Sequence, residues 1–144
     1  MLVLLDTDHL SILQMRNQPF CDRLEARLSH HPVDQIAVSI VSFHEHVQGW
    51  FAWLNRAKTD EQIIRGYTQL QSILHDYCRM RLLPFEADAQ TIFAALRSQQ
   101  RRMQTMDLRI AAIALAHNAV LLTRNERDFA KIASLQIEDW TRGE

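Results

Sequence analysis

The chain has 144 residues, 47% of them hydrophobic, and a formal net charge of −1 at pH 7. This length fits one globular domain over residues 1–144, and the near-neutral charge gives no general argument for nucleic-acid binding. No run of about 18 or more uncharged apolar residues occurs, and four apolar residues lead directly into Asp6. We therefore expect no membrane span and no signal peptide, and a cytoplasmic location.

Short apolar runs alternate with helical stretches along the chain. A buried strand is predicted over residues 2–5, followed by helices over 8–15 and 19–30, a strand over 36–40 and a helix that begins near Ser42. A long helix over 60–79, a strand over 82–85 and a helix over 86–97 come next. An alanine-rich helix from Asp107, a strand over 119–123, a helix over 125–133 and an edge strand over 135–137 complete the chain. This alternation is typical of an α/β fold with a parallel sheet covered on both faces.

The helix after Ser42 carries an apolar stripe at helical spacing. The stripe consists of Val47, Trp50, Phe51 and Leu54, which predicts that these side chains face the core. Trp53 falls off the stripe. An exposed tryptophan would suggest a surface for a partner protein or a second subunit.

Acidic residues follow the apolar strands at comparable positions. Asp6 follows the first strand, Glu45 lies just beyond the second, Asp128 follows the strand over 119–123, and Asp107 begins the alanine-rich helix. Because the carboxyl ends of parallel strands share one edge of a sheet, we expect these carboxylates to converge. Clustered like charges are unfavourable without a counterion, and Mg²⁺ or Mn²⁺ is the cation that oxygen-only ligands favour.

Each of these acids also has a purely structural interpretation. Asp6 can cap the helix that follows it, and Ser42 with Glu45 has the spacing of a capping box. Asp107 in a first helical turn is favoured by the helix dipole, and Asp128 can belong to a helix cap. The order of all four along the alternating strands favours a shared metal site.

Four stretches carry a family resemblance, at residues 4–11, 39–45, 107–114 and 121–129. Together they resemble the four acidic motifs of PIN-domain nucleases, and most of all those of the VapC toxins of bacterial type II toxin–antitoxin pairs. The resemblance spans nearly the whole chain. It implies a three-layer α/β/α sandwich with a mostly parallel sheet, and an endoribonuclease that needs Mg²⁺ or Mn²⁺ and uses a metal-activated water. It also implies a homodimer and inhibition by a cognate antitoxin; whether tRNA or rRNA is cut stays open.

The resemblance also assigns roles to residues. Asp6, Glu45 and Asp107 match the family's invariant acids, which implies metal binding and catalysis at these positions. Members use an acid at either of two places for the fourth position; Asn125 occupies one here, so Asp128 is predicted to fill it.

Two further features concern the surroundings of these acids. Asp8 stands where many members carry asparagine, and it is predicted as an accessory ligand together with Thr123 and Asn125. The segment 102–106 lacks the glycines often found before the third acid, which affects the expected geometry of that loop.

Arginines crowd around Asp107. Of the sixteen basic residues only Lys58 and Lys131 are lysine. The guanidinium fork matches phosphate oxygens, so we predict RNA binding by a set of four arginines, with a solvated helix face as the alternative. The set consists of Arg97, Arg101, Arg102 and Arg109. For His9, His44 and His46, which flank acids, surface or capping roles are expected before RNA contacts.

Two other classes of function compete with a nuclease. In a haloacid-dehalogenase-like phosphatase Asp6 would be the nucleophile and Asp8 the general acid, but the later strands lack a paired-acid motif and Glu45 would have no role. In a non-catalytic RNA-binding or receiver-like module the acids would be helix caps. A receiver would need a lysine at the last strand end, and an RNA-binding module would more often be basic overall.

Overall fold

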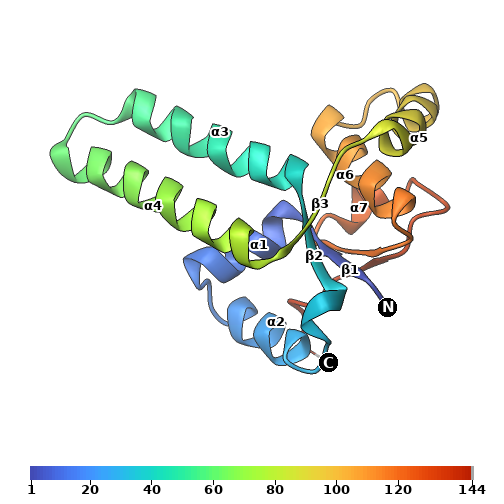
Figure 1. The fold of residues 1–144 in the computed structure, drawn as a ribbon, viewed down its shortest axis with the longest axis horizontal. Helices are drawn as coiled ribbons and strands as arrows, with labels where there is room; N and C mark the ends of the chain where they lie inside the picture. Colours follow the sequence, from blue (N-terminus) through green and yellow to red (C-terminus); the bar gives the residue numbers. More distant parts are fainter. Residues whose placement is uncertain (144) are drawn as a thin grey trace.

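Five parallel strands form the centre of the molecule in the computed structural model, which describes residues 1–143 (Figure 1). In chain order they are β1 (Val3–Leu5), β2 (Ile36–Ser39), β3 (Arg81–Leu83), β4 (Val120–Leu122) and β5 (Ile137–Glu138). Their order across the sheet is β3-β2-β1-β4-β5, and every neighbouring pair is parallel. β1 lies in the middle because all three of its residues are buried apolar side chains.

The helices fall on both sides of this sheet (Figure 1). They are α1 (Thr7–Met15), α2 (Phe20–Leu28), α3 (Ile40–Arg56), α4 (Asp60–Arg79), α5 (Ala87–Gln99), α6 (Thr105–Ala116) and α7 (Glu126–Phe129), with a 3-10 turn η1 (Val33–Gln35) before β2. Successive strand residues point to opposite faces. Leu4 accordingly packs with α5 and α6, whereas Val3 and Leu5 pack with α1, α2 and α4. The predicted three-layer α/β/α sandwich is confirmed.

Helices α3 and α4 form a long hairpin that projects from the sheet (Figure 1). They approach closely at Gly66, where an added Cβ would lie 2.5 Å from Leu54 Cδ2. Trp53 is half-buried in this hairpin, with its ring against Trp50 and its Nε1 donating to the Gln62 carbonyl at 2.9 Å. The expectation of an exposed Trp53 is therefore wrong.

Phe51 departs from the predicted core stripe, since 53% of it is exposed. This part of α3 extends beyond the sheet and packs along α4, so a single neighbour covers only one side of the helix (Figure 1).

Some predicted boundaries also need correction. Helix α2 ends at Leu28, and α7 ends at Phe129, four residues before the predicted end. The edge strand β5 lies at Ile137–Glu138 and not at 135–137. Within residues 1–143, no helix combines the length and the apolar composition that crossing a membrane requires.

Candidate active site

Asp6 lies at the junction of β1 and α1, at the carboxyl edge of the sheet. Its backbone N–H donates to the Leu122 carbonyl of β4 at 2.9 Å, which continues the strand pairing by one residue. Its Oδ1 accepts from the Thr7 N–H at 2.8 Å, so Asp6 is also the N-cap of α1. The capping interpretation and the position at the strand end are thus both correct for this residue.

The other oxygen of Asp6 faces β4. Thr123, the first residue after β4, donates from Oγ1 to Asp6 Oδ2 at 2.8 Å and lies 3.3 Å from Asp8 Oδ2. Asp8 Oδ2 also accepts from the Arg124 N–H at 2.9 Å. Asp6, Asp8 and Thr123 therefore form one hydrogen-bonded group across two neighbouring strand ends.

Glu45 joins this group through a residue that sequence reasoning did not assign to the site. The Thr7 hydroxyl donates to Glu45 Oε1 at 2.7 Å and lies 3.0 Å from Ser42 Oγ. Thr7 lies between Asp6 and Asp8 in the first motif. Its hydroxyl lies beside Glu45 because β1 pairs with β2, which brings the two strand ends together. No local pattern in the sequence indicates that contact.

The helix that carries Glu45 starts earlier than predicted. Ser39 is its N-cap, with Oγ accepting from the Ser42 N–H at 3.0 Å, and α3 begins at Ile40. The predicted capping box between Ser42 and Glu45 is therefore wrong. The Glu45 carboxylate therefore has no capping role, and it accepts from the Thr7 hydroxyl instead.

Asp107 lies in the first turn of α6 and is half-buried. Burial, as the largest cause, together with the negative charges of Glu45, Asp128 and Asp8 in that order, raises its pKa to about 6. Burial also raises the pKa of Asp6 to about 7, with the charge of Asp8 as the next cause and a smaller contribution from Asp107. Asp6 and Asp107 are thus held in a common negative field that disfavours their ionised forms.

Asp128 contributes to this field from α7. Its Oδ2 accepts from Asn125 Nδ2 at 3.1 Å, and Lys131 Nζ lies 3.7 Å from its Oδ1. The Asn125 N–H in turn donates to Thr123 Oγ1 at 3.0 Å. Asn125 and Asp128 therefore lie at the end of β4 as a linked pair, and the acid of the pair acts on Asp107.

The chemistry of these donors fits a hard divalent cation. All the converging side chains offer oxygen, and burial, followed by the charges of neighbouring acids, raises the pKa values of Asp6 and Asp107; a bound cation would favour their ionised forms. In residues 1–143 no three histidine, cysteine or acidic side chains are already arranged as a metal cluster. Mg²⁺ is commonly held by one or two carboxylates and several waters, so a preassembled cage is not needed.

Two histidines beside the acids are buried, which corrects the expectation of surface roles. His9 is fully buried, and its Nε2 accepts from the Trp140 N–H at 3.3 Å. Its Nδ1 therefore carries the proton in the neutral ring and donates to Asp8 Oδ1 at 2.8 Å. His46 lies between Ser11 Oγ at 3.0 Å and the Tyr77 hydroxyl at 2.8 Å, and burial lowers its pKa to about 4.

The four arginines near Asp107 occupy different environments. Arg97 donates to the carbonyls of Arg101 at 3.2 Å and Met103 at 2.8 Å, and so braces the connection between α5 and α6. Arg101 and Arg102 are exposed on that connection. Arg109 is half-buried on α6, with its guanidinium 5.5 Å from the Phe93 ring centre.

The family model that matches this chain is the PIN domain, over residues 3–135. The chain belongs to the PIN domain family. Among related proteins, this PIN domain is similar to Ribonuclease VapC1 of Haemophilus influenzae strain R2866, with 33% identity over 99% of this chain and 100% of that protein. Ribonuclease VapC1 of strain Rd of the same species is 32% identical over the same shares.

Solved structures give the same assignment. VapBC-1 of nontypeable Haemophilus influenzae is 28% identical with a TM-score of 0.76, and the match covers 99% of this chain and 100% of that chain. VapBC-5 of Mycobacterium tuberculosis, a member of the VapBC family of toxin–antitoxin systems, is 25% identical with a TM-score of 0.59, over 95% of each chain. The resemblance to VapC-type PIN domains that the four motifs indicate is therefore confirmed.

Proposed function

We propose that this PIN domain is a divalent-metal-dependent endoribonuclease and the toxin of a toxin–antitoxin pair. The observation that carries the proposal is the common negative field at the carboxyl edge of the sheet, where burial and neighbouring acids raise the pKa values of Asp6 and Asp107. The similarity to proteins named Ribonuclease VapC1 supports RNA as the substrate. The Thr7 hydroxyl donates to Glu45 and so joins it to the group around Asp6. A phosphatase mechanism would give Glu45 no role, so its place in the site favours the nuclease.

The acids would together bind Mg²⁺ or Mn²⁺. Asp6 and Asp107 would be the principal ligands, Glu45 and Asp128 would complete the site, and Asp8, Thr123 and Asn125 would support it through the hydrogen bonds described above. When bound, the cation lowers the pKa of a water molecule and neutralises charge at the phosphodiester. Thr7 donates to the Glu45 carboxylate and so would hold it in place for metal binding, and His9 holds Asp8 in one orientation.

The exposed arginines would bind the RNA backbone without reading sequence. Arg101 and Arg102 lie on the connection that leads into α6, the helix that carries Asp107. Because guanidinium groups match phosphate oxygens, they would place a strand of RNA near the acids. Arg97 would act mainly by bracing this connection, since its guanidinium already donates to two carbonyls of the connection and to Thr105 Oγ1.

We further propose a cognate antitoxin as partner, a homodimer as the assembly and the cytoplasm as the location. The antitoxin is supported by a solved relative that belongs to a toxin–antitoxin family. The homodimer rests on the resemblance of the motifs alone, and sedimentation velocity of the purified chain measures it directly.

The test of this function compares RNA cleavage and phosphate-monoester hydrolysis in Asp6→Asn, Asp8→Asn, Glu45→Gln and Asp107→Asn. A nuclease loses most RNA cleavage in the Asp6, Glu45 and Asp107 variants and in excess EDTA. Asp8→Asn is expected to be mild, because many members of the family carry asparagine at this position. An inactive Asp8→Asn beside an active Glu45→Gln, with monoester hydrolysis, would instead establish the phosphatase mechanism.

A further inference from the structure

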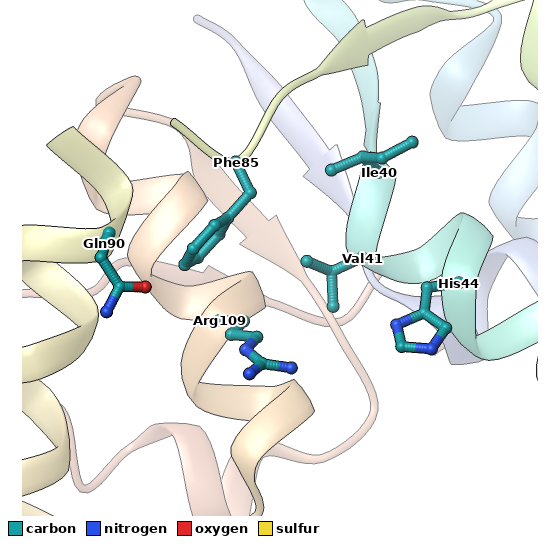
Figure 2. A pocket seen from close by; sticks show the side chains of 6 residues that line it. All are labelled: Ile40, Val41, His44, Phe85, Gln90 and Arg109. Carbon is teal, nitrogen blue, oxygen red and sulfur yellow. The ribbon is translucent and has the colours of Figure 1, made fainter. Parts of the chain in front are cut away.

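A separate cleft of about 290 Å³ opens between α3, α5 and α6 (Figure 2). Its walls come from the start of α3, from the loop between β3 and α5, from α5 and from α6. The lining residues are Ile40, Val41, His44, Phe85, Gln90 and Arg109. The volume is at the small end of the range for ligand sites, so it suits one small group better than a protein segment.

Two lining residues are close in sequence to proposed metal ligands. His44 precedes Glu45 on α3, and Arg109 follows Asp107 by two residues on α6. Successive helical residues are rotated by about 100°, so Arg109 points away from the direction of Asp107. The same two helices therefore present their acids to the metal site and these side chains to the cleft.

Arg109 brings an uncompensated positive charge to the cleft. It is half-buried, and no carboxylate in residues 1–143 forms an ion pair with it. Its Nη1 donates to Met106 Sδ at 3.9 Å, a weak acceptor, and its guanidinium lies 5.5 Å from the Phe93 ring centre. A partly desolvated guanidinium with free donors is a good match for a phosphate oxygen.

The opposite wall is apolar and aromatic. The Phe85 ring is held edge-on against Phe93 at 6.4 Å between ring centres, and Val41 projects into the cleft beside it (Figure 2). Figure 2 also shows Gln90 flanking the Phe85 ring, with an amide that can both donate and accept. An aromatic face, an amide and a guanidinium in one small cleft are the groups that recognise an unpaired base with its phosphate.

We propose that this cleft binds one unpaired nucleotide of the RNA substrate, next to the phosphodiester that is cut. The base packs on Phe85 and meets the Gln90 amide, and Arg109 binds the adjoining phosphate with His44 at the rim. The proposal rests on the proposed ribonuclease function, which supplies the polyanionic substrate. Because only an unpaired base can enter the cleft, the RNA must be single-stranded at this position.

The experiment measures binding of a short single-stranded RNA of mixed sequence in EDTA, where the RNA is not cut, and cleavage of the same RNA in Mg²⁺. Phe85→Leu keeps an apolar side chain and is expected to weaken binding roughly tenfold, within the range of base–aromatic stacking, with an unchanged salt slope. Arg109→Gln is expected to weaken binding and to lower the slope of log affinity against log salt by about 0.7. Arg23→Gln, an exposed arginine on α2, is the matched control and is expected to bind as wild type does.

RNAs with a single abasic nucleotide locate the bound base. At one position the missing base should weaken binding to wild type and remove the effect of Phe85→Leu. Wild-type affinity in both cleft variants, with normal wild-type cleavage in Mg²⁺, would refute the nucleotide site and leave the ribonuclease function intact. Wild-type RNA affinity combined with a changed sedimentation coefficient would assign the cleft to a contact between copies. Failure of the wild-type protein itself to cleave RNA in Mg²⁺ would refute the proposed function.

Discussion

Asp6→Asn should make the metal-free protein more stable while it removes activity. Asp6 is 6% exposed, and its carboxylate is ionised at alkaline pH only against the effects of burial and of Asp8. The asparagine can keep both hydrogen bonds, since its carbonyl oxygen can accept from the Thr7 N–H and its amide can donate to Thr123 Oγ1. The substitution therefore removes a buried charge without leaving a polar group unpaired.

The magnitude follows from the pKa of Asp6. Its pKa rises from 3.8 to about 7 in the folded protein. At about 1.4 kcal/mol per pKa unit, the ionised form costs about 4 kcal/mol of folding free energy above pH 8. Because Asp8 and Asp107 lose a repulsive neighbour but the amide remains polar and buried, we expect a net gain of about 2 kcal/mol. For a chain of this size that gain raises Tm by roughly 6 °C.

The dependence on pH has a defined sign. A carboxyl group with a raised folded-state pKa stabilises the fold when protonated, and this stabilisation is lost as pH rises from about 4 through about 7. The free energy of unfolding of the wild type should therefore fall across that window in EDTA. In Asp6→Asn the fall should be smaller, with Asp107 still contributing because burial raises its pKa to about 6.

Urea unfolding in EDTA, at steps between pH 4 and pH 8, measures both effects. Asp139→Asn is the matched control, and its expected effect on the free energy of unfolding has the opposite sign. Although burial raises the pKa of Asp139, hydrogen bonds from Thr141 lower it overall, so its loss should destabilise the protein above pH 4 and matter less as the pH falls. An Asp6→Asn protein that is less stable than wild type at pH 8, with an unchanged pH profile, would refute the charge-field description of the site.

Three other changes have defined outcomes. Gly66→Val should destabilise the α3–α4 hairpin by about 2 kcal/mol in urea unfolding, since even a Cβ there would lie 2.5 Å from a side-chain atom of α3; wild-type stability would contradict that close approach. Thr7→Val should lower RNA cleavage roughly tenfold by releasing Glu45, with Thr7→Ser restoring it, whereas equal loss in both variants would indicate a packing effect. Replacing both Arg101 and Arg102 with glutamine should lower the slope of log affinity for RNA against log salt by about 1.4. An unchanged slope would show that the two arginines lie on a solvated surface and do not bind RNA.

The order of strands and helices, and the edge where the acids meet, could be predicted from the sequence. Both depend on signals that are local: short apolar runs, the helical spacing of apolar residues, and the fact that residues directly after parallel strands share one edge. Asp6 illustrates this, because its place after a buried strand determines its place in the site whatever the rest of the chain does.

Contacts between distant residues could not be predicted in the same way. His9 is buried because the C-terminal segment returns to bring the Trp140 N–H to its ring, and the two residues are 131 positions apart. The hydrogen bond from Thr7 to Glu45 spans 38 positions and depends on the pairing of β1 with β2. For Phe51 the error is that a core contact was predicted and is absent, since the side chain is exposed. A local apolar stripe does not show how far a helix extends beyond its sheet.

The cap of α3 shows a third kind of error, in which two residues offer the same local signal. Ser39 and Ser42 can both cap a helix, and the structure uses Ser39. The choice moves the helix start by three residues and decides whether the Glu45 carboxylate caps a helix or faces the site. Pairing of β2 with β3 up to Ser39 fixes the strand end and thereby the cap.

The central claim is that Asp6 and Asp107 act as one unit on a divalent cation during RNA cleavage. The direct test measures Mg²⁺-dependent cleavage rates of Asp6→Asn, Asp107→Asn and the variant that carries both substitutions. Residues that act as a unit are strongly non-additive, so each single substitution should lower the rate by roughly a thousandfold or more, and the pair should lower it little further. Losses that multiply in the double variant, or a single variant that cleaves RNA at close to the wild-type rate, would contradict a shared metal site.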